Sequence, residues 1–155
     1  MKSVIATTLF ALLSFSAFAG SLVTLPSCKD VKGNILNGSV DQLKVVMRSR
    51  LDRPQVMATG VVTQILPEDH AGLPHQKYTL TVDGQIKLLI VSNLDFGRVP
   101  LQVGQTLSVC GEYKNVGQGM IHWTHFDPHG GHADGFTIVN GALYGDKEVP
   151  GFNVY

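Results

Sequence analysis

The segment KYTLTVDGQIKLLIV, residues 77–91, gives the clearest structural signal in this sequence. Polar and apolar residues alternate on both sides of Asp83-Gly84, as they do in two strands that each bury one face. Asp-Gly favours a two-residue type I′ turn, in which both central residues have positive φ. The segment therefore predicts an antiparallel β-hairpin within a mainly β chain.

Shorter strand-like runs flank this hairpin. Residues 54–63 carry apolar side chains on both faces, which predicts a long strand buried on much of both sides. Residues 67–74 are expected to form a loop. Asn140-Gly141 repeats the type I′ pattern and predicts a closing hairpin. The remaining strands are expected at residues 106–113, 120–123, 136–139 and 142–144.

One short helix is expected over residues 39–50, because apolar residues recur there at helical spacing after Ser39, a favourable N-cap residue. These strands, with short, glycine-rich connections, predict a mainly β fold, namely a small single-domain β-barrel, closed or partly open. Residues 101–111, LQVGQTLSVCG, resemble the turn–strand unit of oligonucleotide/oligosaccharide-binding (OB) barrels, so the barrel is expected to be OB-like. A sandwich of the same strands is the alternative.

The N-terminus has the pattern of a secretory signal peptide over residues 1–19. Lys2 precedes an apolar run, and Ala17-Phe18-Ala19 is a small-x-small cleavage pattern. The run is shorter than the roughly 20 residues that a membrane-spanning helix needs, so cleavage near Gly20 is favoured over a retained anchor. We therefore expect a periplasmic or secreted protein with no integral membrane segment after cleavage.

The remaining chain has the length of one domain. Residues 20–53 are expected to form an N-terminal extension with the short helix, and residues 54–155 the β-barrel domain. The sequence has 12 Lys and Arg residues against 12 Asp and Glu residues. Such a balance argues against non-specific nucleic-acid binding, which depends on the neutralisation of phosphates.

Cys28 and Cys110 are the two cysteines of the sequence. In an exported protein they are expected to form a disulfide, and two separate buried thiols are the alternative. Because side chains alternate along a strand, Leu107 and Val109 are expected on one face and Cys110 on the other. Cys110 is therefore expected to point toward an N-terminal segment packed over the barrel.

Four of the six histidines fall within residues 122–132, HWTHFDPHGGH. Imidazole is the commonest transition-metal ligand in proteins. Pro128 and the neighbouring glycines exclude a helix that would align all four rings, so two or three rings are expected to converge from a loop. The candidate metal ligands are His125, His129 and His132, with zinc or copper as the expected ion. The alternative is that these histidines only make hydrogen bonds within a polar loop.

The same region could support acid–base chemistry. His125 and His75 are candidate general bases, with Asp127 as the carboxylate that orients the imidazole. Trp123, the only tryptophan, is expected to be a core side chain rather than an exposed stacking platform. Loops at one end of a barrel converge, which would gather further polar side chains there. The candidate binding residues are His122, Trp123, Asn93, Asp95 and Glu112.

These features favour an exported small binding protein with a histidine-rich polar site for a metal ion or for a small polar or oligomeric ligand. The alternative is a histidine-dependent, metal-assisted hydrolase, such as a phosphodiesterase, a nuclease or a glycan-active enzyme. A structural envelope protein, in which the histidine loop is only a scaffold, is a third reading.

Several segments together resemble an uncharacterised family of small exported bacterial proteins, domain of unknown function 3465. The most specific is His-Trp-Thr-His-x-Asp-Pro at residues 122–128, and the resemblance covers roughly residues 60–144. The family has a histidine where this chain has Ser92 and a tryptophan where it has Phe136. The resemblance implies a signal peptide and a barrel-like single domain, and it implies no activity. The other segments that carry it are residues 66–69, 75–76, 93–95 and 111–113, with His132 and Gly135.

Overall fold

The computed structural model describes residues 24–49, 51–69 and 72–147, so the predicted signal peptide (1–19) lies outside the described residues. The described chain is mainly β with one short α-helix, as predicted. Its elements are α1 (Val40–Arg48), β1 (Gln55–Asp69), β2 (His75–Val82), β3 (Ile86–Asn93), the 3₁₀ helix η1 (Leu94–Phe96), β4 (Thr106–Lys114), β5 (Met120–His122), β6 (Phe136–Val139) and β7 (Ala142–Tyr144).

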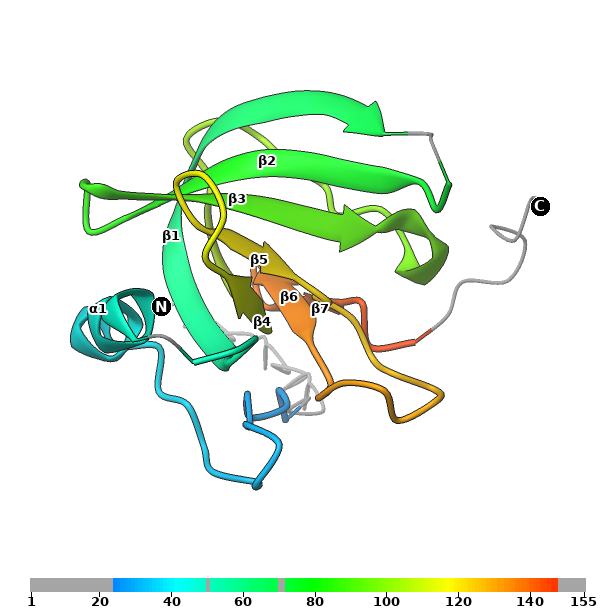
Figure 1. Ribbon diagram of the computed structural model, residues 1–155. Coiled ribbons are helices and arrows are strands. Elements are labelled where there is room, and N and C mark those ends of the chain that lie inside the picture. The colour runs from blue at the N-terminus through cyan, green and yellow to red at the C-terminus, as the bar shows by residue number, and fades with distance from the viewer. Residues whose placement is uncertain (1–23, 50, 70–71, 148–155) are drawn as a thin grey trace, which may run out of the picture.

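The strands form one mixed sheet in the order β1-β2-β3-β5-β4-β6-β7, and β1 also pairs with β4. Because β4 pairs with β1 as well as with β5, the strands β1 to β5 form a partial ring (Figure 1). Neighbouring strands are antiparallel except β3 and β5, which are parallel. β6 and β7 extend the sheet beyond β4.

β1 is long enough to serve two neighbours. It pairs with β4 from Gln55 to Val61 and with β2 from Val61 to Asp69, and it curves between these two partners (Figure 1). Gly60 lies at this crossover, where a Cβ atom would be 2.5 Å from the carbonyl oxygen of Thr81. β1 therefore continues past residue 63 and into the predicted loop, because β2 supplies a second set of hydrogen bonds.

The prediction that both faces of this strand are largely buried is wrong. Val56, Ala58 and Val62 are buried, whereas Thr59 and Val61 on the opposite face are exposed. A partial ring has one interior, so alternate residues of β1 face the core and the others face solvent.

The β2–β3 hairpin turns at the predicted Asp83-Gly84, and both residues have the positive φ values, 52° and 65°, that a type I′ turn requires. The loop is longer than predicted, because Val82 pairs with Ile86 and three residues rather than two separate the strands. The inward side chains of both strands are buried in the main core. That core comprises Leu43, Val56, Ala58, Val62, Tyr78, Leu80, Val82, Leu88, Ile90, Val99, Leu107, Val109, Tyr113, Ile121 and Val139.

α1 begins where the sequence predicts. The side chain of Ser39 accepts a hydrogen bond from the backbone N–H of Gln42 (3.2 Å), which is the expected N-cap contact. The helix ends at Arg48 and presents Leu43, which is 2% exposed, to the main core.

Cys28 and Cys110 form the predicted disulfide, with Cα atoms 5.6 Å apart across 82 residues of chain. Cys110 points away from the main core and forms a second, smaller core with Cys28 and Phe136. The predicted outward direction of Cys110 is confirmed. In the chain-entropy account, closing so long a loop stabilises the fold by about 4 kcal/mol.

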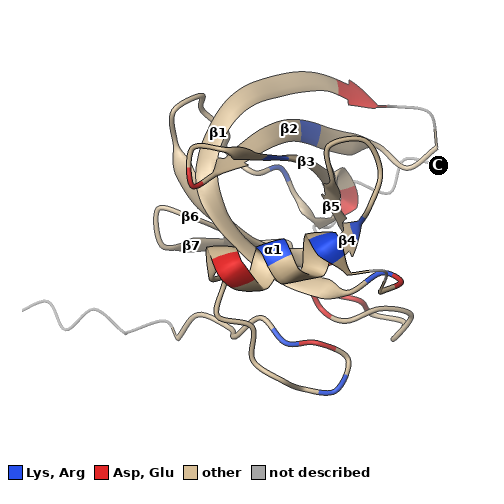
Figure 2. Cartoon of the chain, turned by 60° about the vertical axis from the view of Figure 1, so that its left-hand side comes forward, with Lys and Arg blue, Asp and Glu red and all other residues tan. Residues whose placement is uncertain are grey.

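Acidic and basic residues are interspersed along the strands and α1 in the view of Figure 2. This agrees with the equal numbers of acidic and basic residues in the sequence. Neither helix in the described ranges has both the length and the apolar character needed to cross a membrane.

Candidate functional site

The histidine-rich segment leaves the sheet at the end of β5. The strand ends at His122, and Trp123 has a φ of 52°, a left-handed conformation that few non-glycine residues adopt. Two of the other non-glycine residues with positive φ in the described ranges, Asp83 and Asn140, belong to hairpin turns; the remaining one is Arg53. Arg53 and Trp123 line the same pocket, and strained backbone of this kind is typical of binding sites.

Three glycines hold the start of this segment by close backbone contact. A Cβ atom on Gly111 would lie 2.6 Å from the carbonyl oxygen of residue 122, and one on Gly145 would lie 2.5 Å from that of residue 124. A Cβ atom on Gly135 would overlap the carbonyl oxygen of residue 123. The Gly135 N–H also donates to the carbonyl of His125 (2.8 Å). The path of the chain through residues 122–125 is therefore fixed by packing.

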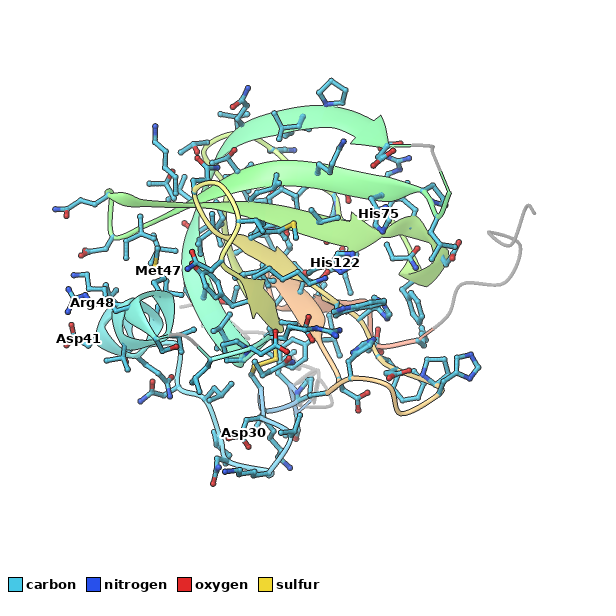
Figure 3. All side chains as sticks on the ribbon, viewed as in Figure 1. Asp30, Asp41, Met47, Arg48, His75 and His122 are labelled. Atoms are coloured by element: carbon cyan, nitrogen blue, oxygen red, sulfur yellow. A yellow bond between two sulfur atoms is a disulfide. The ribbon has the colours of Figure 1, made fainter. Side chains whose placement is uncertain are left out.

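Imidazole rings surround Trp123, which is half-buried. His132 stacks on the indole with ring centroids 4.5 Å apart, His122 packs against it at 4.6 Å, and the edge of His125 meets it at 5.7 Å. His75, at the start of β2, extends the cluster through a 5.4 Å contact with His122 (Figure 3). The fold thus gathers four histidines from β2, β5 and the following loop.

His125 is buried, with 5% of its surface exposed, and stacks on Phe96 of η1 at a centroid distance of 3.8 Å. Its Nδ1 lies 2.6 Å from the carbonyl oxygen of Phe126. Because a carbonyl oxygen can only accept, Nδ1 carries the proton and Nε2 keeps a lone pair. No partner among the described residues forms a hydrogen bond with this buried Nε2. Burial also lowers the pKa of His125, so the ring is neutral at neutral pH.

His132 has the same arrangement. Its Nδ1 lies 2.8 Å from the carbonyl oxygen of Ala133, to which it donates its proton. The Nε2 atom of the same ring lies 3.9 Å from Oδ2 of Asp127. The rings of His125 and His132 meet edge to face, with centroids 5.0 Å apart.

Asp127 organises the turn between these two histidines. Its Oδ1 accepts the backbone N–H of His129 (2.9 Å), and its Oδ2 accepts that of His132 (2.6 Å). These donors hold the pKa of Asp127 down to about 2. The Asp127 carboxylate was predicted to orient the His125 ring, but it holds the loop backbone instead. The ring of His125 is oriented by the main-chain carbonyl of Phe126.

His122 and His75 are also neutral near pH 7. Burial, followed by the nearby charge of Lys114, lowers the pKa of His122 to about 4. Burial is likewise the main cause that lowers the pKa of His75. The Nδ1 atom of His122 is buried and has no hydrogen-bond partner within the described chain. The imidazoles of His75, His122 and His125 are therefore uncharged at neutral pH.

A pocket of about 360 Å³ opens beside this cluster. Trp123, His125 and His132 contribute one part of its wall, and Asp95 and Phe96 of η1 contribute another. The indole Nε1 of Trp123, a donor, is buried without a hydrogen-bond partner in the part of the chain that the structure describes. His75 and His122 are not among the residues that line this pocket.

Two further predicted binding residues support the pocket from outside. Glu112 is 6% exposed and accepts a hydrogen bond from Nε of Arg53 (2.8 Å), which fixes Arg53 in the lining. Lys114 approaches the same carboxylate at 3.9 Å. The side chain of Asn93 accepts the backbone N–H of Asp95 (2.9 Å) and so caps η1.

The structure brings together two of the three predicted metal ligands. His125 and His132 are in ring contact, whereas His129 is exposed at the rim of the pocket. Across residues 24–49, 51–69 and 72–147, no group of three or more His, Cys, Asp and Glu side chains could hold a metal ion.

Sequence reasoning missed Phe96 and Arg53. Neither lies in the histidine segment, and each reaches the pocket only because the strands close into a partial ring. Arg53 is 59 residues from its partner Glu112, and the pairing of β1 with β4 brings the two together. A correct pairing of these strands would have been the signal that located Arg53.

Fold and site together define a class: a mainly β protein with one disulfide, in which a partial ring of strands presents a histidine–tryptophan pocket. The chain belongs to the family described as Protein of unknown function (DUF3465), whose profile matches residues 26–145. The predicted family is confirmed, and the match extends further toward the N-terminus than expected, so that it includes Cys28. No curated protein matches the sequence.

Proposed function

We propose that this protein is an exported binding protein whose ligand occupies the histidine–tryptophan pocket. The observation that carries the proposal is a pair of buried polar atoms in the pocket residues, Nε2 of His125 and Nε1 of Trp123, which lack protein partners in the described chain. Leaving such an atom unsatisfied costs about 1–3 kcal/mol. A ligand that satisfies both would recover this free energy on binding.

The size and lining of the pocket support a small polar ligand. A volume of about 360 Å³ falls in the range of roughly 300–1,000 Å³ that is typical of ligand sites. Aromatic rings supply apolar surface, while His125 offers an acceptor and Trp123 a donor. Arg53 adds a guanidinium group at the edge of the same pocket.

The fold and the disulfide support the finer assignments. The pairing order β1-β2-β3-β5-β4-β1, with β3 and β5 parallel, leads us to infer an OB-like barrel, in which loops at the barrel ends commonly bind ligands. A disulfide persists in oxidising compartments, which supports export to the periplasm or beyond.

Binding is better supported than hydrolysis. A general base in the hydrolase alternative needs a group that orients and strengthens it. The ring of His125 is held by the carbonyl of Phe126, and Asp127 is occupied by backbone N–H donors. His75 lies outside the pocket lining.

Native mass spectrometry of untagged protein, isolated from the compartment to which its own host exports it, tests this proposal. We expect one non-covalent ligand per chain, lost in His125→Gln and kept in His75→Gln, which removes an imidazole outside the pocket. Trp123 is the only tryptophan, so its fluorescence reports on the same site. A ligand-free mass, together with fluorescence that does not respond to a small-molecule extract of that compartment, would contradict the proposal.

A further inference from the structure

We propose that the pocket binds a free α-amino acid, with its carboxylate at Arg53 and its ammonium group near the carboxylates of Asp95 and Asp127. This inference rests on the proposed function, because it names the ligand class of the same pocket. The lining contains one guanidinium group and two carboxylates, those of the three residues just named. An α-amino acid carries one charge of each sign at neutral pH, since its carboxyl group is deprotonated and its amino group protonated.

Arg53 is held in a way that suits a carboxylate ligand. Its Nε donates to Oε1 of Glu112 at 2.8 Å, and Glu112 is 6% exposed, so one edge of the guanidinium plane is fixed from within the protein. This bond leaves the two terminal amino groups of Arg53 for a ligand, and the side chain that lines the pocket is 51% exposed. A planar guanidinium group matches a carboxylate through two parallel hydrogen bonds.

The carboxylates lie on another part of the lining. Burial lowers the pKa of His125, whereas the charges of Asp127 and Asp95 act in the opposite direction, so both carboxylates are near this ring. Asp95 precedes Phe96 in η1, and Phe96 stacks on His125 at a centroid distance of 3.8 Å. Arg53, by contrast, forms its ion pair with a glutamate outside the lining. The pocket therefore has a negative side beside His125 and a positive group at Arg53.

The rest of the lining suits an apolar side chain. Leu73, Phe96, Trp123 and Pro128 contribute apolar or aromatic surface to the same pocket. The volume of about 360 Å³ is near the lower end of the range for ligand sites, which favours a single amino acid over a peptide. Contact of the ligand's side chain with these residues would add affinity in proportion to the apolar area removed from water. We therefore expect amino acids with apolar or aromatic side chains to bind best.

The two kinds of charge also select against molecules with a single charge. An organic anion would approach Arg53 but would also meet the ionised carboxylate of Asp127, whose pKa is about 2. An amine would be attracted to Asp95 and Asp127 but would share a small pocket with the guanidinium group. A molecule that carries both charges gains free energy at each group and avoids this repulsion.

Isothermal titration calorimetry of the untagged protein tests the inference without knowledge of which amino acid binds. Each common amino acid is compared with two analogues of the same side chain, one that lacks the amino group and one that lacks the carboxyl group. We expect one bound amino acid per chain for at least one apolar or aromatic side chain. Loss of a hydrogen bond to a charged group weakens binding by about 10- to 150-fold, so both analogues should bind more weakly by about that factor.

Two variants separate the two charges. Arg53→Gln should weaken binding of the amino acid by about 10- to 150-fold without weakening binding of the analogue that lacks the carboxyl group. Asp95→Asn should show the reverse pattern, with no loss for the analogue that lacks the amino group. Arg98→Gln is the matched control, because Arg98 is also 51% exposed and paired with a glutamate, Glu68, but does not line this pocket. It should bind the amino acid like the wild type.

Equal affinity for an amino acid and for its analogue without the amino group would overturn the inference, as would the absence of binding by every amino acid. The wild-type comparison decides the matter even if a variant fails to fold. If no amino acid binds but native mass spectrometry finds another ligand, this inference fails and the proposed function stands. If neither is found, both fail.

Discussion

Acidification should destabilise this protein through His122. Burial beside Trp123 and His75, together with the nearby charge of Lys114, lowers the pKa of the ring from 6.5 to about 4. The unfolded chain therefore binds a proton below about pH 6.5 that the folded protein does not accept until about pH 4, so the free energy of unfolding falls as the pH falls through this window. The full shift corresponds to about 3 kcal/mol. Because the ring is only half-buried, solvent screening reduces the expected loss to about 2 kcal/mol.

Urea unfolding at several pH values between 7 and 4, followed by far-UV circular dichroism, measures this loss. His122→Gln has no imidazole at that position, so its stability should depend on pH less steeply by the same amount. Some pH dependence should remain, because burial also lowers the pKa values of His125 and His75. Equal slopes for the wild type and the variant would refute the reasoning.

Three further predictions concern packing, hydrogen bonding and the disulfide. Gly135→Ala should lower the free energy of unfolding by about 2 kcal/mol or more and shift the emission of Trp123, because the new methyl group would overlap a backbone carbonyl. Gly131→Ala is the matched control, because its new methyl group would make only an ordinary contact, 3.5 Å from Oδ2 of Asp127. Equal effects of the two substitutions would argue against the close contact at Gly135. Gln76→Met removes two buried hydrogen bonds with the backbone of Val99 (2.9 and 3.0 Å) and should cost about 2 kcal/mol in thermal unfolding, without changing pocket fluorescence. Reduction of the disulfide should lower the free energy of unfolding by up to about 4 kcal/mol, and a melting curve unaffected by reductant would count against its stabilising role.

Local signals in the sequence predicted the local structure well. The alternation around Asp83-Gly84 located a hairpin, and Ser39 located the start of the helix. These predictions succeed because turn conformation and N-capping depend on a few adjacent residues.

The closure of the strands into a partial ring could not be predicted from such local signals. The apolar pattern of residues 54–63 suggested burial on both faces, although Thr59 and Val61 are exposed. Which face of β1 is buried depends on its pairing with β4, some 50 residues away in the sequence. Local periodicity contains no information on that pairing.

The candidate site was predicted only in part, for the same reason. The sequence showed that histidines are concentrated in one segment. The contact of His132 with Trp123, however, depends on the left-handed backbone at Trp123 and on the close approach of Gly135. The stacking partner of His125, Phe96, comes from a separate helical turn. Spacing in sequence could not distinguish His129, at the rim, from the two rings that touch.

The central claim is that His125 presents an unprotonated Nε2 atom in one pocket with Trp123, on which His132 stacks. Nuclear magnetic resonance of ¹⁵N-labelled imidazoles tests it most directly, because nitrogen shifts identify the tautomer and ring-to-ring Overhauser effects identify the contacts. We predict protonated Nδ1 atoms on both rings at neutral pH, with cross-peaks from His125 to Phe96 and from His132 to Trp123. A proton on Nε2 of His125, or the absence of these cross-peaks, would contradict the account.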